Sequence, residues 1–181
     1  MHLSRLTCVL AVLAALVPAV ASASSLTVES SAFVNGGTIP SLDSGSLRGC
    51  IGRNISPPLR ITGVPPAARS VGIVVFDLDA GGGAGYVHWV AYGIAPALAS
   101  LPPGFGTTAG AYVGGKNDAG TTTYAGPCPP PGDPPHHYQF TVYALSLAPA
   151  QLPPGLTRGG FLHAAAGHTL AVGTLTGTFA R

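Results

Sequence analysis

Glycine and proline constrain this chain more than any other feature, because they interrupt helical patterns along most of its length. The sequence contains 26 glycines and 18 prolines among 181 residues. These are the two residues least favourable inside an α-helix, and both are common in turns between short strands. Apolar residues still make up 46% of the chain, which is more than a disordered segment carries. The composition therefore predicts a folded, turn-rich, mainly β protein.

Six segments have the composition and the flanking turn residues of β-strands. Residues 71–76 form a nearly continuous apolar run, which predicts a central strand covered on both faces. Residues 138–144 alternate between two faces with a period of two. One helix of about two turns is expected between Leu156 and His168. These elements together indicate a β-sandwich or a similar two-sheet fold. The predicted strands are Leu26–Glu29, Leu59–Thr62, Ser70–Asp77, Tyr86–Ile94, His137–Leu145 and Thr169–Phe179.

The first 23 residues have the features of an export signal. Arg5 gives a positive start, residues 6–20 form an apolar run, and Ala21-Ser22-Ala23 provides the small residues of a cleavage site. The run is shorter than the roughly 20 apolar residues that span a membrane. We therefore expect a signal peptide at residues 1–23, one domain at residues 24–181, no transmembrane segment after cleavage, and a secreted or periplasmic protein. An uncleaved anchor is the alternative.

Charged residues are scarce, with eight Lys and Arg against six Asp and Glu. No basic run compensates for this balance, so a nucleic-acid partner is not indicated.

Two cysteines, Cys50 and Cys128, remain after removal of a signal that contains Cys8. In an oxidising compartment such a pair predicts an intramolecular disulfide, and two unpaired thiols are the alternative. Neither cysteine has the CxxC spacing of a redox or zinc site.

Titratable residues collect at the ends of three predicted strands. Asp77 and Asp79 close one strand, His88 lies in the next, and His136 and Tyr138 open a third. Residues two apart in a strand share a face. If the three strands are neighbours, one concave patch holds two carboxylates, two imidazoles and a phenol. Such a patch can bind a phosphate or a carboxylate, while its own carboxylates orient the imidazoles or accept an ammonium group.

A stiff loop precedes the third of these strands. Six of the nine residues from Pro127 to Pro135 are prolines, so the backbone has few amide donors and little freedom. Rigid loops beside strands are common places for binding sites.

Each of these signals also has a simpler structural explanation. An Asp-x-Asp pair at a strand end is common in turns, and a histidine between Val87 and Trp89 is often a hydrogen-bonded core residue. We expect Tyr86, Trp89 and Tyr92 in the core rather than on a recognition surface. Asn54 begins an Asn-x-Ser glycosylation pattern, but a proline follows that pattern directly.

Several catalytic chemistries lack their motifs. The glycine cluster at residues 81–85 is followed by a strand pattern rather than by the Lys-Ser/Thr of a phosphate-binding loop. The GxSxG turn of a serine hydrolase is absent. His88, His136 and the two aspartates are suitable metal ligands, but the HExxH spacing is missing. We therefore expect neither a cofactor nor a metal, and a metal-assisted hydrolase is a minor alternative.

Several motifs follow one another in a recognisable order over residues 31–177. They are Gly52-Arg53-Asn54-Ile55-Ser56-Pro57-Pro58-Leu59, Gly63-Val64-Pro65, Asp77-Leu78-Asp79-Ala80, His88-Trp89-Val90, Lys116-Asn117-Asp118, and Gly126-Pro127-Cys128-Pro129-Pro130-Pro131-Gly132 leading to His136-His137-Tyr138. As an ordered set they resemble the phosphatidylethanolamine-binding protein family, in its bacterial Raf-kinase-inhibitor-like (YbhB/YbcL) branch. Two departures stand out: the family's Asp-Pro-Asp-Ala-Pro is Asp77-Leu78-Asp79-Ala80-Gly81 here, and Val87 replaces the aromatic residue that often precedes the strand histidine.

The resemblance implies a β-sandwich of antiparallel sheets with a small anion pocket. It also implies a non-catalytic protein that binds phosphate, phosphoethanolamine or a carboxylate, as a small anion or as a phospholipid head group. Inhibition of a protease or kinase by protein contact is the alternative function. Carried over by position, the ligand-binding residues are Asp77, Asp79, His88, Pro129, Pro130, His136 and Tyr138.

Overall fold

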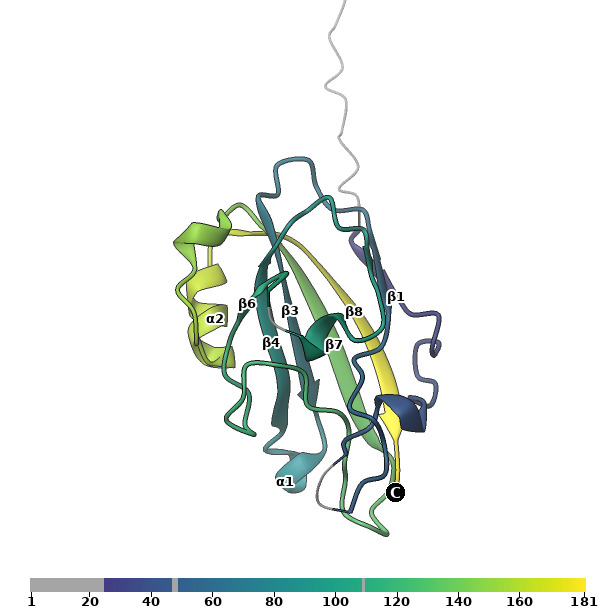
Figure 1. Ribbon diagram of the computed structural model, residues 1–181. Coiled ribbons are helices and arrows are strands. Elements are labelled where there is room, and N and C mark those ends of the chain that lie inside the picture. Colours follow the sequence, from purple (N-terminus) through teal and green to yellow (C-terminus); the bar gives the residue numbers. More distant parts are fainter. Residues whose placement is uncertain (1–24, 47–48, 109) are drawn as a thin grey trace, which may run out of the picture.

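The computed structural model describes residues 25–46, 49–108 and 110–181 (Figure 1). The expected signal peptide, with Cys8, lies outside these described residues. Two antiparallel sheets face one another. The smaller sheet has the strand order β1-β2-β5, with β1 at Thr27–Glu29, β2 at Leu59–Thr62 and β5 at Ser100–Leu101. The larger sheet has the order β6-β4-β3-β7-β8, with β6 at Val113–Gly114, β4 at Tyr86–Ile94, β3 at Ser70–Asp77, β7 at His136–Leu145 and β8 at Thr169–Phe179.

Helical elements are short and lie outside the sheets. They are α1 at Ala80–Gly83, α2 at Arg158–Ala165, and three 3-10 turns, η1 at Ser41–Asp43, η2 at Phe105–Thr107 and η3 at Pro149–Gln151. The helix expected between Leu156 and His168 is α2, and its first turn is capped by the Thr157 hydroxyl, which accepts from the Gly160 amide at 3.1 Å.

The six predicted strands all form, and their ends agree with the prediction to within one residue. The sequence analysis missed β5, β6, α1 and the 3-10 turns. β5 and β6 have only two residues each, which is too short for any alternation to show. α1 arises in the glycine cluster, where Gly81 and Gly82 adopt left-handed backbone angles that other residues rarely reach.

The central strand β3 is covered on both faces, as its apolar run predicts. Val71, Ile73 and Val75 pack between the two sheets, whereas Val74 packs on the opposite face with residues of α2. Figure 1 shows α2 lying against that outer face of the larger sheet. Because β3 is buried on both sides, its end at Asp77 is held in a fixed position.

A β-bulge in β4 changes which residues face the smaller sheet. Val75 pairs with Trp89, but the next residue of β3, Phe76, pairs with Val87, so His88 is the extra residue. Trp89 belongs to the core between the sheets, and His88 lies beside Tyr138 of the same core. The bulge therefore turns two successive residues of β4 toward the same layer.

Antiparallel pairing brings the end of β3 beside the beginnings of β4 and β7. Asp77 pairs with Tyr86 on one side and with Tyr138 on the other. This is the end of the sheet that carries α1 (Figure 1).

Gly72 on β3 leaves the space that Phe161 of α2 occupies, because a Cβ atom at this position would lie 2.4 Å from the Phe161 ring. We predict that Gly72→Ala lowers the free energy of unfolding by about 1–3 kcal/mol through overpacking. Gly159→Ala, at an open position in α2, should stabilise the protein slightly through helix propensity. Urea denaturation of both variants checks the contrast, and an undisturbed Gly72→Ala protein would contradict it.

Candidate functional site

A cavity of about 530 Å³ opens at the end of the sheet where β3, β4 and β7 meet. It is lined by six of the seven residues proposed from the resemblance: Asp77, Asp79, His88, Pro129, Pro130 and His136. Tyr138 lies behind them, fully buried, with its ring edge-on to His88 at 5.1 Å and roughly parallel to His136 at 6.4 Å between centroids. The structure therefore brings the predicted residues together, although the phenol packs beneath the imidazoles and does not line the cavity.

Asp77 is a buried carboxylate with several hydrogen bonds, and only 3% of the residue is exposed. Its Oδ1 accepts from the backbone amides of Asp79 and Ala80 at 2.9 and 3.1 Å. Its Oδ2 accepts from His136 Nδ1 at 2.8 Å. The turn interpretation of this aspartate is confirmed by Oδ1, while Oδ2 is occupied by the His136 ring.

His136 donates from Nδ1 to Asp77 in that hydrogen bond, so Nε2, on the other side of the ring, is not used by Asp77. Nε2 lies 3.6 Å from Oδ2 of Asp133. Burial alone lowers the pKa of His136, but the hydrogen bond and charge of Asp77, with a smaller effect of Asp133, outweigh it and raise the pKa. Of the two histidines that line the cavity, His136 is thus the one whose protonated form its surroundings favour.

The surroundings of His88 shift its pKa in the opposite direction. Its Nδ1 lies 2.6 Å from the carbonyl oxygen of Ala125 and donates to it, so Nε2 carries the lone pair. Nε2 is 4.0 Å from Asp77 Oδ2. Burial lowers the pKa of His88, and the Ala125 hydrogen bond and the charge of Asp77 only partly offset that effect. The neutral His88 therefore accepts hydrogen bonds, whereas His136 donates them.

Asp79 lies at the rim of the cavity and is paired with His137, a residue that the sequence analysis did not assign. Its Oδ2 accepts from the backbone amide and from Nδ1 of His137 at 2.6 and 2.9 Å. The backbone hydrogen bond is the largest cause that lowers the pKa of Asp79, and the nearby imidazole lowers it further. This carboxylate is therefore a fixed negative charge at the rim.

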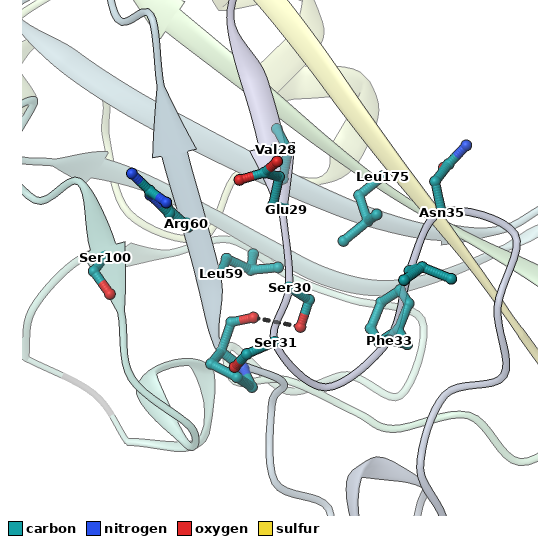
Figure 2. Close-up of a pocket in the computed structure, with 12 residues that line it drawn as sticks. Val28, Glu29, Ser30, Ser31, Phe33, Asn35, Leu59, Arg60, Ser100 and Leu175 are labelled. Atoms are coloured by element: carbon teal, nitrogen blue, oxygen red, sulfur yellow. Dashed lines mark hydrogen bonds between the residues drawn. The ribbon is translucent and has the colours of Figure 1, made fainter.

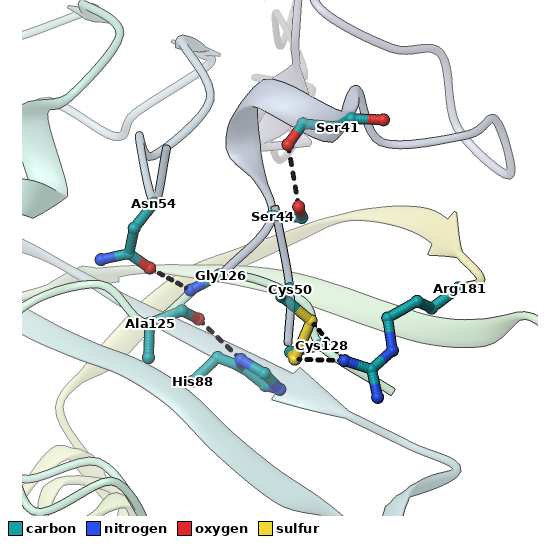
Figure 3. The surroundings of a disulfide bond; sticks show 9 residues. All are labelled: Ser41, Ser44, Cys50, Asn54, His88, Ala125, Gly126, Cys128 and Arg181. Atoms are coloured by element: carbon teal, nitrogen blue, oxygen red, sulfur yellow. Dashed lines mark hydrogen bonds between the residues drawn. A yellow bond between two sulfur atoms is a disulfide. The ribbon is translucent and has the colours of Figure 1, made fainter. Parts of the chain in front are cut away.

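The Cys50–Cys128 disulfide forms as predicted and joins two loops 78 residues apart in sequence (Figure 3). Cys128 lines the cavity beside Pro129 and Pro130. The disulfide therefore ties the proline-rich wall of the cavity to the loop that contains Cys50.

Comparison with known families agrees with this architecture. The family model described as phosphatidylethanolamine-binding protein matches residues 29–180. The chain belongs to this family.

Relatives in the family come from distant organisms. A putative lipoprotein, LppC, of Mycobacterium tuberculosis is 42% identical over 160 residues, which cover 86% of this chain and 75% of the relative. The crystal structure of Escherichia coli YbcL, described as a member of the mammalian PEBP family, has a TM-score of 0.79 and 30% identity. That of CT736, a putative PEBP homologue from Chlamydia trachomatis, has a TM-score of 0.76 and 34% identity. Each of these structures matches 87% of this chain and 99% of its own length.

Asn54 belongs to one of the family motifs, yet its part in the site was missed. Its Nδ2 donates to the Tyr124 carbonyl at 3.0 Å, and its Oδ1 accepts from the Gly126 amide at 2.7 Å. These two residues flank Ala125, the hydrogen-bond partner of His88. Asn54 therefore fixes the position of His88 through the loop, and its amide is engaged inside the protein.

A second hollow, of about 590 Å³, lies between β1, β2 and the segment that follows β1 (Figure 2). Figure 2 shows Glu29 and Arg60 on neighbouring strands and the hydrogen bond from the Ser30 hydroxyl to the Pro58 carbonyl. None of the residues predicted for ligand binding lines it, and it contains no imidazole. The chemistry of the side chains therefore favours the smaller cavity as the functional site of this family member.

Within the described residues, no group of three or more His, Cys, Asp and Glu side chains is arranged to hold a metal ion. Over the same part of the chain, no helix has the length and apolar character needed to cross a membrane.

The Asp77–His136 pair should make stability depend on pH. Because the pKa of His136 is raised in the folded protein, the pair stabilises fully below the unfolded histidine pKa of about 6.5, and the stabilisation is lost as pH rises through the folded-state pKa. We predict that Asp77→Asn destabilises by about 2 kcal/mol at pH 5.5 and by less at pH 8.5. Urea denaturation at both pH values measures this, with the exposed Glu29→Gln as control. Equal losses at both pH values would contradict the assignment.

Asn54 has a left-handed backbone with φ of 53°, so glycine is the matched substitution that adds no strain. We predict that Asn54→Gly loses about 1–2 kcal/mol of stability and broadens the His88 ring signals in nuclear magnetic resonance (NMR) spectra, because the loop at Ala125 is released. Unchanged His88 signals would show that the amide does not position this residue.

Proposed function

We propose that the cavity binds a small phosphate-bearing ligand that also carries an amine, with phosphoethanolamine as the simplest example. The observation that carries this proposal is that one cavity holds two imidazoles with different partners, His136 donating to the Asp77 carboxylate and His88 to the Ala125 carbonyl. A protonated His136 can donate from Nε2 to a phosphate oxygen, and His88 Nε2 can accept from an ammonium or a protonated phosphate.

The charges around the cavity favour a zwitterion over a bare anion. The described lining residues include the carboxylates of Asp77, Asp79 and Asp133 but no Lys or Arg. A phosphate dianion alone would meet net negative charge, whereas an amine on the same molecule would be attracted to the aspartates at the rim. The pocket of this family member therefore suits an ethanolamine-type head group better than inorganic phosphate.

The residues of the cavity support a binding role and not a catalytic one. The buried Asp77, the tautomer of His88 and the stiff Pro129–Pro130 wall all fix geometry. The described lining residues include no serine or cysteine hydrogen-bonded to an imidazole as an activated nucleophile would be. We accordingly propose a non-catalytic binding protein.

We also propose that the protein acts outside the cytoplasm. The signal-like residues 1–23 and the disulfide support export, and the mycobacterial relative is named a putative lipoprotein. Mass spectrometry of the mature protein should find its first residue at Ser24.

Isothermal titration with phosphoethanolamine tests the ligand. Affinity should be highest near pH 6 and should fall as pH rises through the raised pKa of His136, because the donor to phosphate is lost. His136→Asn should weaken binding by about tenfold or more. His168→Asn is the matched control, since His168 lies beyond the opposite end of β7 and contacts Ser146. The proposal would be refuted if the titrations gave no heat of binding at any pH and a fluorescence binding assay also detected no binding.

Ethyl phosphate tests whether the ammonium group contributes to affinity, because it carries the phosphate of phosphoethanolamine but no amine. We expect it to bind about tenfold more weakly than phosphoethanolamine. Equal affinity for both ligands would show that the rim carboxylates do not contribute.

A further inference from the structure

We propose that the Cys50–Cys128 disulfide is a site of thiol exchange whose reduction loosens the wall of the cavity. Three observations converge on it. Cys128 is partly exposed and lines the cavity, whereas Cys50 is buried. The guanidinium Nη1 of Arg181 lies 3.4 Å from Cys50 Sγ and 3.8 Å from Cys128 Sγ. Figure 3 shows both contacts beside the loop that holds His88.

The disulfide is part of a short chain of contacts that ends at His88. Gly126, two residues before Cys128, donates its amide to Oδ1 of Asn54. Ala125 accepts from the His88 ring and donates its amide to the His88 carbonyl at 3.0 Å. The same wall is attached to the loop before Cys50 by a hydrogen bond from the Gly45 amide to the Pro127 carbonyl at 2.8 Å. The disulfide adds a covalent bond to these hydrogen bonds between the two loops.

Glycines let these two loops approach closely. A Cβ atom at Gly126 would lie 2.4 Å from the Asp43 carbonyl oxygen, and one at Gly45 would lie 3.3 Å from the Cys128 Cβ. The wall is thus held by packing and hydrogen bonds as well as by the disulfide, so reduction loosens the wall locally and leaves the rest of the fold intact.

The different exposure of the two cysteines sets the direction of exchange that we propose, because Cys50 is buried and Cys128 is partly exposed. A thiolate of a dithiol reductant attacks Cys128 Sγ from the cavity and forms a mixed disulfide, while the Cys50–Cys128 bond breaks and its electron pair leaves on Cys50. Arg181 stabilises the resulting Cys50 thiolate. The second thiol of the reductant then attacks the reductant sulfur of the mixed disulfide. The Cys128 thiolate leaves and the reductant closes to its own disulfide, so two electrons pass from the dithiol to the protein.

Reduction removes the covalent tie between the Cys50 loop and Pro129–Pro130. The Ala125–His88 contact then loses part of its support, and the wall of the cavity becomes free to move. The predicted change in ligand affinity rests on the proposed function. The predicted thiol exchange and the predicted change at the His88 ring are independent of it.

Glutathione trapping of the full-length mature protein tests the direction of exchange. After brief exposure to reduced glutathione and quenching with iodoacetamide, we expect peptide mass spectrometry to find glutathione on Cys128 and carbamidomethyl on Cys50. Glutathione on Cys50 instead, or no adduct at millimolar glutathione, would overturn the proposal.

Arg181→Gln should slow reduction by dithiothreitol about threefold, because the leaving thiolate loses its cation. Arg69→Gln is the matched control, since Arg69 is an exposed arginine next to the start of β3, at the opposite end of that strand from Asp77. Equal rates for Arg181→Gln and the control would remove Arg181 from the mechanism and overturn that part of the proposal.

NMR spectra of the His88 ring nitrogens, recorded before and after reduction, report whether the cavity wall has loosened. We expect the Nδ1–H tautomer signal to weaken while core methyl signals persist, and phosphoethanolamine affinity to fall at least about threefold. Unchanged His88 signals, or global unfolding on reduction, would overturn the inference. An oxidised protein that never binds phosphoethanolamine would instead refute the proposed function and leave the thiol-exchange result to be judged separately.

Discussion

The hydrogen bonds of Asp77 are the constraint on which the cavity depends. A buried carboxylate is costly unless its oxygens are satisfied, and here one oxygen fixes the turn that follows β3 while the other orients His136. The same side chain therefore shapes the backbone at the rim and supplies the charge that raises the pKa of an imidazole. Because β3 is covered on both faces, Asp77 has little freedom to move, and neither do the groups that it holds.

Two histidines of the same type acquire different properties because their surroundings differ. His136 gains a carboxylate partner, whereas His88 is buried and satisfied by a neutral carbonyl. In an unfolded chain both imidazoles would have the same pKa of about 6.5. The structure separates the two pKa values, because a hydrogen bond donated to a charged carboxylate raises the pKa of an imidazole and burial without such a bond lowers it.

The strands were predictable because each long strand carries a strong local pattern, such as the apolar run of β3. The cavity was predictable in outline, because antiparallel pairing places the end of one strand beside the beginnings of its neighbours. The parts that were missed depend on tertiary contacts. Asn54 acts through a loop 70 residues away, and Asp133 and His137 gain their roles from partners that only the fold supplies. The burial of Tyr138 beneath the imidazoles likewise depends on how the two sheets pack.

The bulge at His88 has a consequence for how the sheet assembles. A slipped pairing of β4 with β3 that removed the extra residue would turn the imidazole toward the apolar layer under α2 and away from the Ala125 carbonyl that accepts its ring proton. Such a misaligned sheet would bury an unsatisfied polar group. The side chain that lines the cavity thus also penalises the wrong alignment of the strands, so any substitution of His88 changes both the cavity and the register of β4.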